Sequence, residues 1–175
     1  MSIPNLLSSI RILLIVPIIV LFTYDFYIFS LIVFIFAALT DFFDGYFARL
    51  YKEESILGSL LDLIADKVFI SSLLIWATFN FNNFILLILT ILIISRELSI
   101  SYLRIHALHI GKTANELNAD RGGKIKTTFQ MVGIGFLFIT PINFNFFVIS
   151  LLLISFSAFL SSWLSFLNYY KKWIV

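Results

Sequence analysis

Cysteine is absent from this chain of 175 residues, and charged residues are scarce. Without cysteine, the chain can form no disulfide and can offer no thiolate to a metal ion. Charged residues make up 13% of the sequence and hydrophobic residues 61%, whereas soluble domains have about 25% charged and about 45–50% apolar residues. This composition excludes an ordinary soluble protein, so we expect a lipid bilayer around the chain and no nucleic-acid partner.

Long apolar runs separated by polar or turn-forming residues account for most of the chain. They cover residues 6–23, 27–50, 58–80, 84–108, 124–141 and 146–169. A spanning helix needs about 20 residues and satisfies its own backbone hydrogen bonds in lipid. The predicted fold is therefore all-α, an integral membrane bundle of six transmembrane helices in a single domain, residues 1–175. Because Arg11 lies inside the first run and no cleavage pattern follows it, we interpret that run as a retained span.

Lysine and arginine are missing from the connections on one side of this bundle. With six spans, every basic residue near a loop falls on the side that holds both termini and the second and fourth connections. These residues are Arg11, Arg49, Lys52, Lys112, Arg121, Lys124, Lys126, Lys171 and Lys172. Since cytoplasmic loops are enriched in lysine and arginine, both termini are predicted to be cytoplasmic.

Four aspartates lie near the cytoplasmic ends of the second and third runs, where each costs up to about 2.5–3.5 kcal/mol on insertion scales. Asp41 and Asp44 are three residues apart and Asp62 and Asp66 are four apart, so each pair shares a helical face. A tight turn would bring the four carboxylates together, where they repel one another unless cations lie between them. Oxygen ligands favour Mg²⁺, Mn²⁺ or Ca²⁺. The alternative is a set of interfacial carboxylates that reach to water.

Small residues share the helical faces of these aspartates. Gly45, Ala48 and Gly58 allow either close helix packing or the approach of a nucleotide. Asp41 to Asp66 follow the pattern D-x-x-D-G-x-x-A-R-x(8)-G-x-x-x-D-x-x-x-D, with all eight fixed residues present over 26 positions. This pattern resembles the signature of the CDP-alcohol phosphatidyltransferase family.

The resemblance implies a six-helix membrane enzyme that transfers a phosphatidyl group from CDP-diacylglycerol to an alcohol and releases CMP. Two divalent ions, Mg²⁺ or Mn²⁺, would stabilise the entering and leaving oxygens. The implied metal ligands are Asp41, Asp44, Asp62 and Asp66, with Asp66 also the general base. The implied nucleotide-binding residues are Asp41, Gly45, Ala48, Arg49 and Gly58. The resemblance also implies a homodimer, and with the charge asymmetry it places the active site on the cytoplasmic side of the inner membrane.

Basic residues in the fourth and fifth runs indicate an acceptor that carries its own phosphate. Arg96 and Arg104 are eight residues apart and roughly on one face, and Lys124 and Lys126 open the fifth run. Arginine can bind a phosphate group with two hydrogen bonds. The alternative, anchoring by the positive-inside rule, accounts for Arg121 but poorly for arginines within the fourth run. Glu97, beside Arg96, is interpreted as an ion-pair partner inside the bundle rather than as a catalytic acid.

The resemblance extends beyond the signature. Residues 3–11, 95–97 and 123–127 are similar to the phosphatidylglycerophosphate synthases of the same family, whereas the polar, glycine-rich residues 115–122 depart from them. This similarity implies sn-glycerol 3-phosphate as the acceptor and phosphatidylglycerol phosphate as the product. One alternative is a sister transferase that uses inositol phosphate or serine. A second is an ion or proton transporter that uses its membrane carboxylates.

Overall fold

The computed structural model describes residues 3–51, 56–110, 121–160 and 170, with side chains described at 6–40, 64–107, 109–110, 125–159 and 170. It contains six helices and, in these ranges, no strand. The helices are α1 (Ile3–Thr23), α2 (Tyr27–Tyr51), α3 (Ile56–Phe81), α4 (Phe84–His109), α5 (Arg121–Ile139) and α6 (Asn145–Leu160). The all-helical prediction is therefore confirmed for the part of the chain that the structure describes.

Three of the helices are long and apolar enough to cross a membrane, over Leu6–Thr23 in α1, Ile64–Phe81 in α3 and Phe84–Ala107 in α4. Within the described side chains, the apolar stretches of α2, α5 and α6 are shorter. Helix α5 includes Arg121, three residues before the predicted apolar run begins at 124. The predicted continuation of the last run to residue 169 lies outside the described residues.

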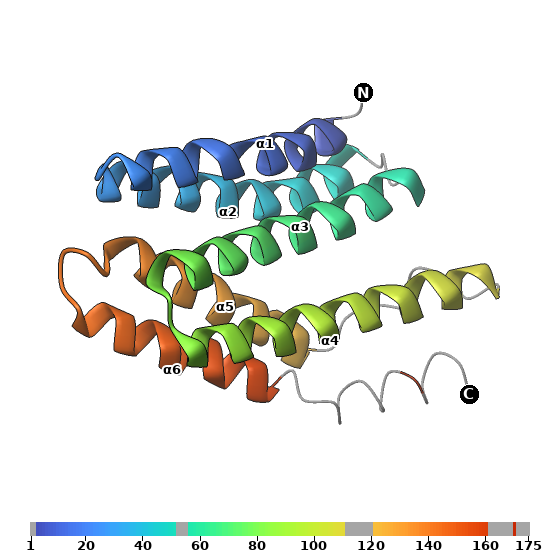
Figure 1. Ribbon diagram of the computed structural model, residues 1–175. Coiled ribbons are helices and arrows are strands. Elements are labelled where there is room, and N and C mark those ends of the chain that lie inside the picture. The colour runs from blue at the N-terminus through green and yellow to red at the C-terminus, as the bar shows by residue number, and fades with distance from the viewer. Residues whose placement is uncertain (1–2, 52–55, 111–120, 161–169, 171–175) are drawn as a thin grey trace.

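Successive helices run in opposite directions, and short turns join α1 to α2, α3 to α4 and α5 to α6 at one end of the bundle (Figure 1). Asp25 in the first turn and Asn82 in the second have φ angles of 64° and 45°. Aspartate and asparagine adopt this left-handed conformation more readily than other non-glycine residues. The starts of α1 and α3 and the ends of α2 and α4 lie at the opposite end (Figure 1).

An aromatic cluster, consisting of Phe22, Tyr27, Trp76 and Phe138, fills the core near the turn end. The ring centroid of Phe22 lies 4.8 Å from that of Trp76, 5.0 Å from that of Tyr27 and 6.0 Å from that of Phe138. Trp76 and Phe138 are stacked with their centroids 5.5 Å apart. These separations are typical of favourable aromatic pairs, and the four rings join α1, α2, α3 and α5.

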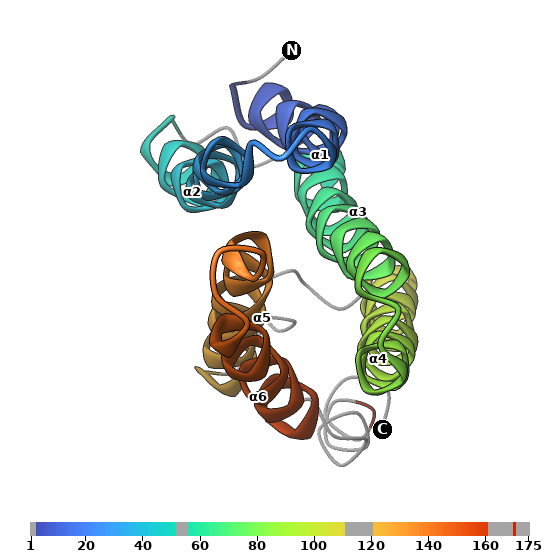
Figure 2. The ribbon, with the colours of Figure 1, turned by 60° about the vertical axis from the view of Figure 1, so that its left-hand side comes forward.

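Small and hydroxylated residues connect neighbouring helices. The Ser30 hydroxyl of α2 donates to the Ile18 carbonyl of α1 at 2.7 Å, and the hydroxyls of Thr78 and Thr90 are 3.0 Å apart between α3 and α4. A Cβ atom at Gly133 would lie 2.8 Å from Ile154 Cγ1, so this glycine permits the close approach of α5 to α6. Figure 2 shows the resulting arrangement, with α1 beside α2 and α3, and α5 beside α6.

Candidate active site

The eight fixed residues of the signature fall on two successive helices. Asp41 to Arg49 belong to the second half of α2, and Gly58 to Asp66 belong to the first half of α3. The end of α2 and the start of α3 lie at the same end of the bundle (Figure 1). Only the side chain of Asp66 is described; those of Asp41, Asp44, Gly45, Ala48, Arg49, Gly58 and Asp62 lie outside the described residues. The predicted convergence of four carboxylates therefore stays a prediction.

Asp66 is held by an arginine from the first helix. Arg11 Nη1 forms an ion pair with Asp66 Oδ1, and Arg11 Nε donates a long hydrogen bond of 3.5 Å to Thr40 Oγ1 on α2. Thr40 in turn donates to the Ala37 carbonyl at 2.7 Å. The Arg11 side chain is fully buried, whereas that of Asp66 is 30% exposed. Arg11 thus connects α1 to both helices of the signature. It contacts α2 at Thr40, directly before Asp41, and α3 at Asp66.

This contact of Arg11 was not predicted from the sequence. Arg11 was assigned only to the cytoplasmic side and to a retained span. A signal was present, because an arginine inside an apolar run is costly without a partner, and Asp66 is one of the few acidic residues at a comparable depth. The sequence alone did not indicate which acidic residue would meet it.

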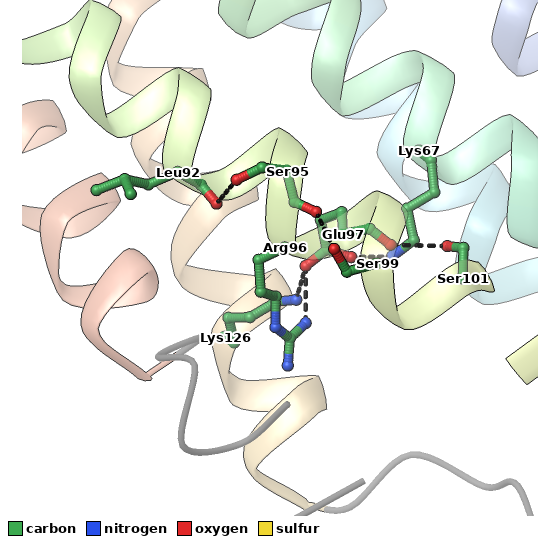
Figure 3. Close-up of polar contacts among 8 residues, drawn as sticks. All are labelled: Lys67, Leu92, Ser95, Arg96, Glu97, Ser99, Ser101 and Lys126. Carbon is green, nitrogen blue, oxygen red and sulfur yellow. Dashed lines mark hydrogen bonds and ion pairs between the residues drawn. The ribbon is translucent and has the colours of Figure 1, made fainter. Parts of the chain in front are cut away.

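A second polar group, the Glu97 cluster, consists of Lys67 of α3, Arg96 and Glu97 of α4, and Lys126 of α5. All three cations point toward the Glu97 carboxylate (Figure 3). Lys126 and Arg96 donate to Oε1, the latter at 2.9 Å, and Lys67 donates to Oε2. The side chains of Arg96 and Glu97 are each 7% exposed and that of Lys126 is 5% exposed. The expected ion pair of Glu97 with Arg96 is present, as one of three.

The charges of the Glu97 cluster do not cancel. Three cations share one carboxylate, which leaves two positive charges uncompensated within the cluster. Buried charges are normally paired, and charge-assisted hydrogen bonds to phosphate are among the strongest in proteins. The arrangement is therefore suited to an anion such as a phosphate group.

Two of the four predicted acceptor-binding residues lie in this cluster, Arg96 and Lys126. Arg104 lies eight residues beyond Arg96 on α4 and is half-buried. Lys124 lies in the first turn of α5, two residues before Lys126, and its side chain lies outside the described residues. Lys67, which was not among the predicted acceptor-binding residues, also contacts Glu97. Its position directly after Asp66 is the feature of the sequence that could have indicated this. The roles predicted for Arg104 and Lys124 stay predictions.

A small cavity of about 40 Å³ separates α3, α4 and α5 beside these groups. Its lining residues are Asp66, Lys67, Ile70, Ser71, Ile93, Glu97, Thr127 and Gln130. Asp66 therefore borders the same space as Lys67 and Glu97 of the Glu97 cluster. A volume of this size holds more than one water molecule, and its walls carry two carboxylates, a lysine, two hydroxyls and an amide among apolar side chains.

Among the described residues, no group of three or more His, Cys, Asp or Glu side chains lies close enough to hold a metal ion. Three of the four predicted ligands, Asp41, Asp44 and Asp62, are not among those side chains. Asp66 is partly exposed and borders a polar cavity, and carboxylate oxygens are the ligands that hard divalent ions prefer. The donor set thus fits such ions in its chemistry.

The sequence matches the CDP-alcohol phosphatidyltransferase family over residues 1–164. Since this match covers nearly the whole chain, the protein belongs to that family. Members of the family generally use divalent metal ions.

Three similar curated proteins carry the name CDP-diacylglycerol–glycerol-3-phosphate 3-phosphatidyltransferase. The relative from Cereibacter sphaeroides is 43% identical over 79% of this chain, and the match spans 63% of the relative's own length. The relative from Wigglesworthia glossinidia brevipalpis is 35% identical over 100% of this chain and 94% of its own. The relative from Salmonella choleraesuis is 34% identical over 80% of this chain and 78% of its own.

Proposed function

We propose that this protein transfers the phosphatidyl group of CDP-diacylglycerol to sn-glycerol 3-phosphate, forming phosphatidylglycerol phosphate and CMP. The observation that carries this proposal is the Glu97 cluster, which has more positive than negative charge and borders the cavity of Asp66 through Lys67 and Glu97. Serine has no phosphate and carries an ammonium group beside its carboxylate, so it matches three clustered cations less well than a phosphate monoester does. The names of the curated relatives support the same acceptor.

In the proposed reaction, Arg96, Lys126 and Lys67 bind the phosphate of the acceptor. Asp66 accepts the proton of the attacking hydroxyl as general base, and its ion pair with Arg11 fixes the direction of the carboxylate. The acceptor oxygen forms a bond to the phosphorus that carries the diacylglycerol. The bond from this phosphorus to the bridging oxygen of the pyrophosphate breaks, and CMP leaves with that oxygen.

Two divalent ions, Mg²⁺ or Mn²⁺, are part of the proposal. Asp41, Asp44, Asp62 and Asp66 would hold them, and when bound they would stabilise negative charge on the oxygens of the pyrophosphate. Asp41, Gly45, Ala48, Arg49 and Gly58 would contact the nucleotide. The continuous helical backbone through both halves of the signature supports these assignments, because residues three or four apart then share a face.

The distribution of apolar and basic residues along the chain indicates how it lies in the membrane. We propose that all six helices of the single domain span the inner membrane and that both termini and the active site face the cytoplasm. The absence of lysine and arginine from the turns at one end supports this orientation. A homodimer, implied by the family resemblance, completes the proposal.

The experiment that tests this function measures CMP release by the purified protein in detergent with CDP-diacylglycerol and Mg²⁺. The acceptors are glycerol 3-phosphate, inositol phosphate, serine and free glycerol, each with and without a chelator. We expect release that depends on glycerol 3-phosphate and stops when the metal is removed. Release with inositol phosphate or serine instead would retain the transferase and refute the acceptor. No release with any acceptor, from folded protein, would refute the transferase and lead to ion-flux measurements in vesicles.

A further inference from the structure

Gln130 borders the same cavity as Asp66 but has no role in the reaction described so far. It lies on α5 four residues after Lys126, which places it one helical turn further into the bundle and on a similar face. The residue is 2% exposed, and its Nε2 atom has no hydrogen-bond partner among the described residues. Buried polar groups nearly always have a partner, so the cavity itself must supply one.

The position of Gln130 relates it to the proposed acceptor. In the proposed reaction the acceptor phosphate binds at the side of the cavity formed by Lys67 and Glu97, where Arg96 and Lys126 also contact Glu97. Asp66, on the same cavity, receives the proton of the attacking hydroxyl. Glycerol 3-phosphate has a second hydroxyl on the carbon between those two groups. This hydroxyl would enter a cavity whose other walls include Ile70 and Ile93, where it needs a hydrogen-bond partner.

An amide side chain meets this need in either orientation. It has a donor at one end and an acceptor at the other, and a hydroxyl both donates and accepts. An isoleucine wall offers neither group. Of the charged residues on the cavity, Asp66, Lys67 and Glu97 have ionic partners. The amide nitrogen of Gln130 has no hydrogen-bond partner in the part of the chain that the structure describes.

We infer that Gln130 recognises the non-reacting middle hydroxyl of the acceptor and thereby selects a polyol phosphate over a simple hydroxyalkyl phosphate. The inference rests on the proposed function. Sites built to hydrogen-bond a substrate hydroxyl reject analogues without it, because the buried polar group of the site is then left unpaired. Gln130 is thus a specificity-determining residue, distinct from the phosphate-binding and proton-accepting groups.

The test compares two acceptors that differ only in the middle hydroxyl, glycerol 3-phosphate and 3-hydroxypropyl phosphate. The wild-type protein should use glycerol 3-phosphate with a kcat/KM about tenfold or more above that of the analogue, as expected for one neutral hydrogen bond. In Gln130→Met, which keeps the length of the side chain, this preference should fall to within about twofold. The decrease should come from glycerol 3-phosphate, with the analogue used as before.

A matched control is Ser150→Ala, which also removes a buried polar atom without a hydrogen-bond partner among the described residues, but which lies on α6 and does not line the cavity. This variant should retain the wild-type preference. An equal loss of both acceptors in Gln130→Met would overturn the inference and leave the proposed function intact. If that variant does not fold, the wild-type ratio decides alone, and equal use of both acceptors refutes the inference. No CMP release by wild-type protein with glycerol 3-phosphate would overturn the proposed function and this inference with it.

Discussion

The aromatic cluster and the Glu97 cluster both lie between helices of the same bundle, but different forces hold them together. The rings of the aromatic cluster contact one another through apolar packing, edge-to-face or stacked, at centroid distances of 4.8–6.0 Å. Other apolar side chains of similar volume could fill the same space. The Glu97 cluster depends on charge and on donor direction, and each of its three cations needs the one carboxylate.

The difference separates stability from function in this protein. Packing of rings serves to join α1, α2, α3 and α5, and it leaves nothing unsatisfied. The Glu97 cluster leaves positive charge uncompensated beside a cavity, which a bundle selected only for stability has no reason to retain. Variants in the two clusters should therefore have different signatures. Substitutions in the Glu97 cluster or at Asp66 should alter catalysis or acceptor binding. Substitutions in the aromatic cluster should alter only the free energy of unfolding.

The largest effect is expected at Asp66, the proposed general base. Asp66→Asn keeps the size of the side chain but removes the proton acceptor, so kcat should fall by about 10²–10⁴-fold. Single-turnover CMP release measures this loss. The control is Asp25→Asn, an exposed aspartate in the turn between α1 and α2, which should leave kcat unchanged. A rate for Asp66→Asn above a tenth of the wild-type value would contradict the role of general base.

The second largest effect is expected at Glu97. Glu97→Gln leaves Lys67, Arg96 and Lys126 close together without a counter-charge, and breaking a buried ion pair costs about 3–5 kcal/mol. The midpoint of thermal unfolding in detergent should therefore fall. Because a bound anion would replace the lost charge, added inorganic phosphate should raise the midpoint of the variant more than that of the wild type. Equal responses to phosphate would show that the cluster is not an anion site.

Lys126→Met should act on acceptor binding rather than on the chemical step. A hydrogen bond to a charged group contributes about 1.5–3 kcal/mol, so kcat/KM for glycerol 3-phosphate should decrease by roughly 10- to 150-fold. The change should appear mainly in the KM for the acceptor. The KM for CDP-diacylglycerol, measured on the same variant, serves as the internal control. An unchanged acceptor KM would remove Lys126 from the phosphate site.

The smallest effect is expected in the aromatic cluster. Phe138→Leu replaces one buried ring with a smaller apolar side chain, which should lower the free energy of unfolding by roughly 1–1.5 kcal/mol. The KM for both substrates and the kcat should match those of the wild type once the protein is folded. Thermal unfolding and steady-state CMP release measure the two quantities. A raised acceptor KM in this variant would contradict the claim that the aromatic cluster affects stability alone.

The fold was easier to predict than the contacts of the site. Six helices followed from apolar runs interrupted at residues such as Asp25 and Asn82, whose left-handed φ angles now explain the turns. Arg96 and Lys126 were predicted to act together because both are cations within apolar segments. The contacts of Lys67 with Glu97 and of Arg11 with Asp66 were not predicted. They depend on how each helix is rotated and tilted against its neighbours, and helix packing rather than hydropathy determines that rotation and tilt.

The central claim, that the chain transfers a phosphatidyl group to glycerol 3-phosphate, is tested most directly by the stoichiometry of the products. Purified protein would be incubated with CDP-diacylglycerol, Mg²⁺ and radiolabelled glycerol 3-phosphate, and CMP and lipid-extractable label would be counted in the same sample. The account predicts one labelled lipid for each CMP. CMP released without label in the lipid would indicate hydrolysis of the donor, and that result would contradict the account.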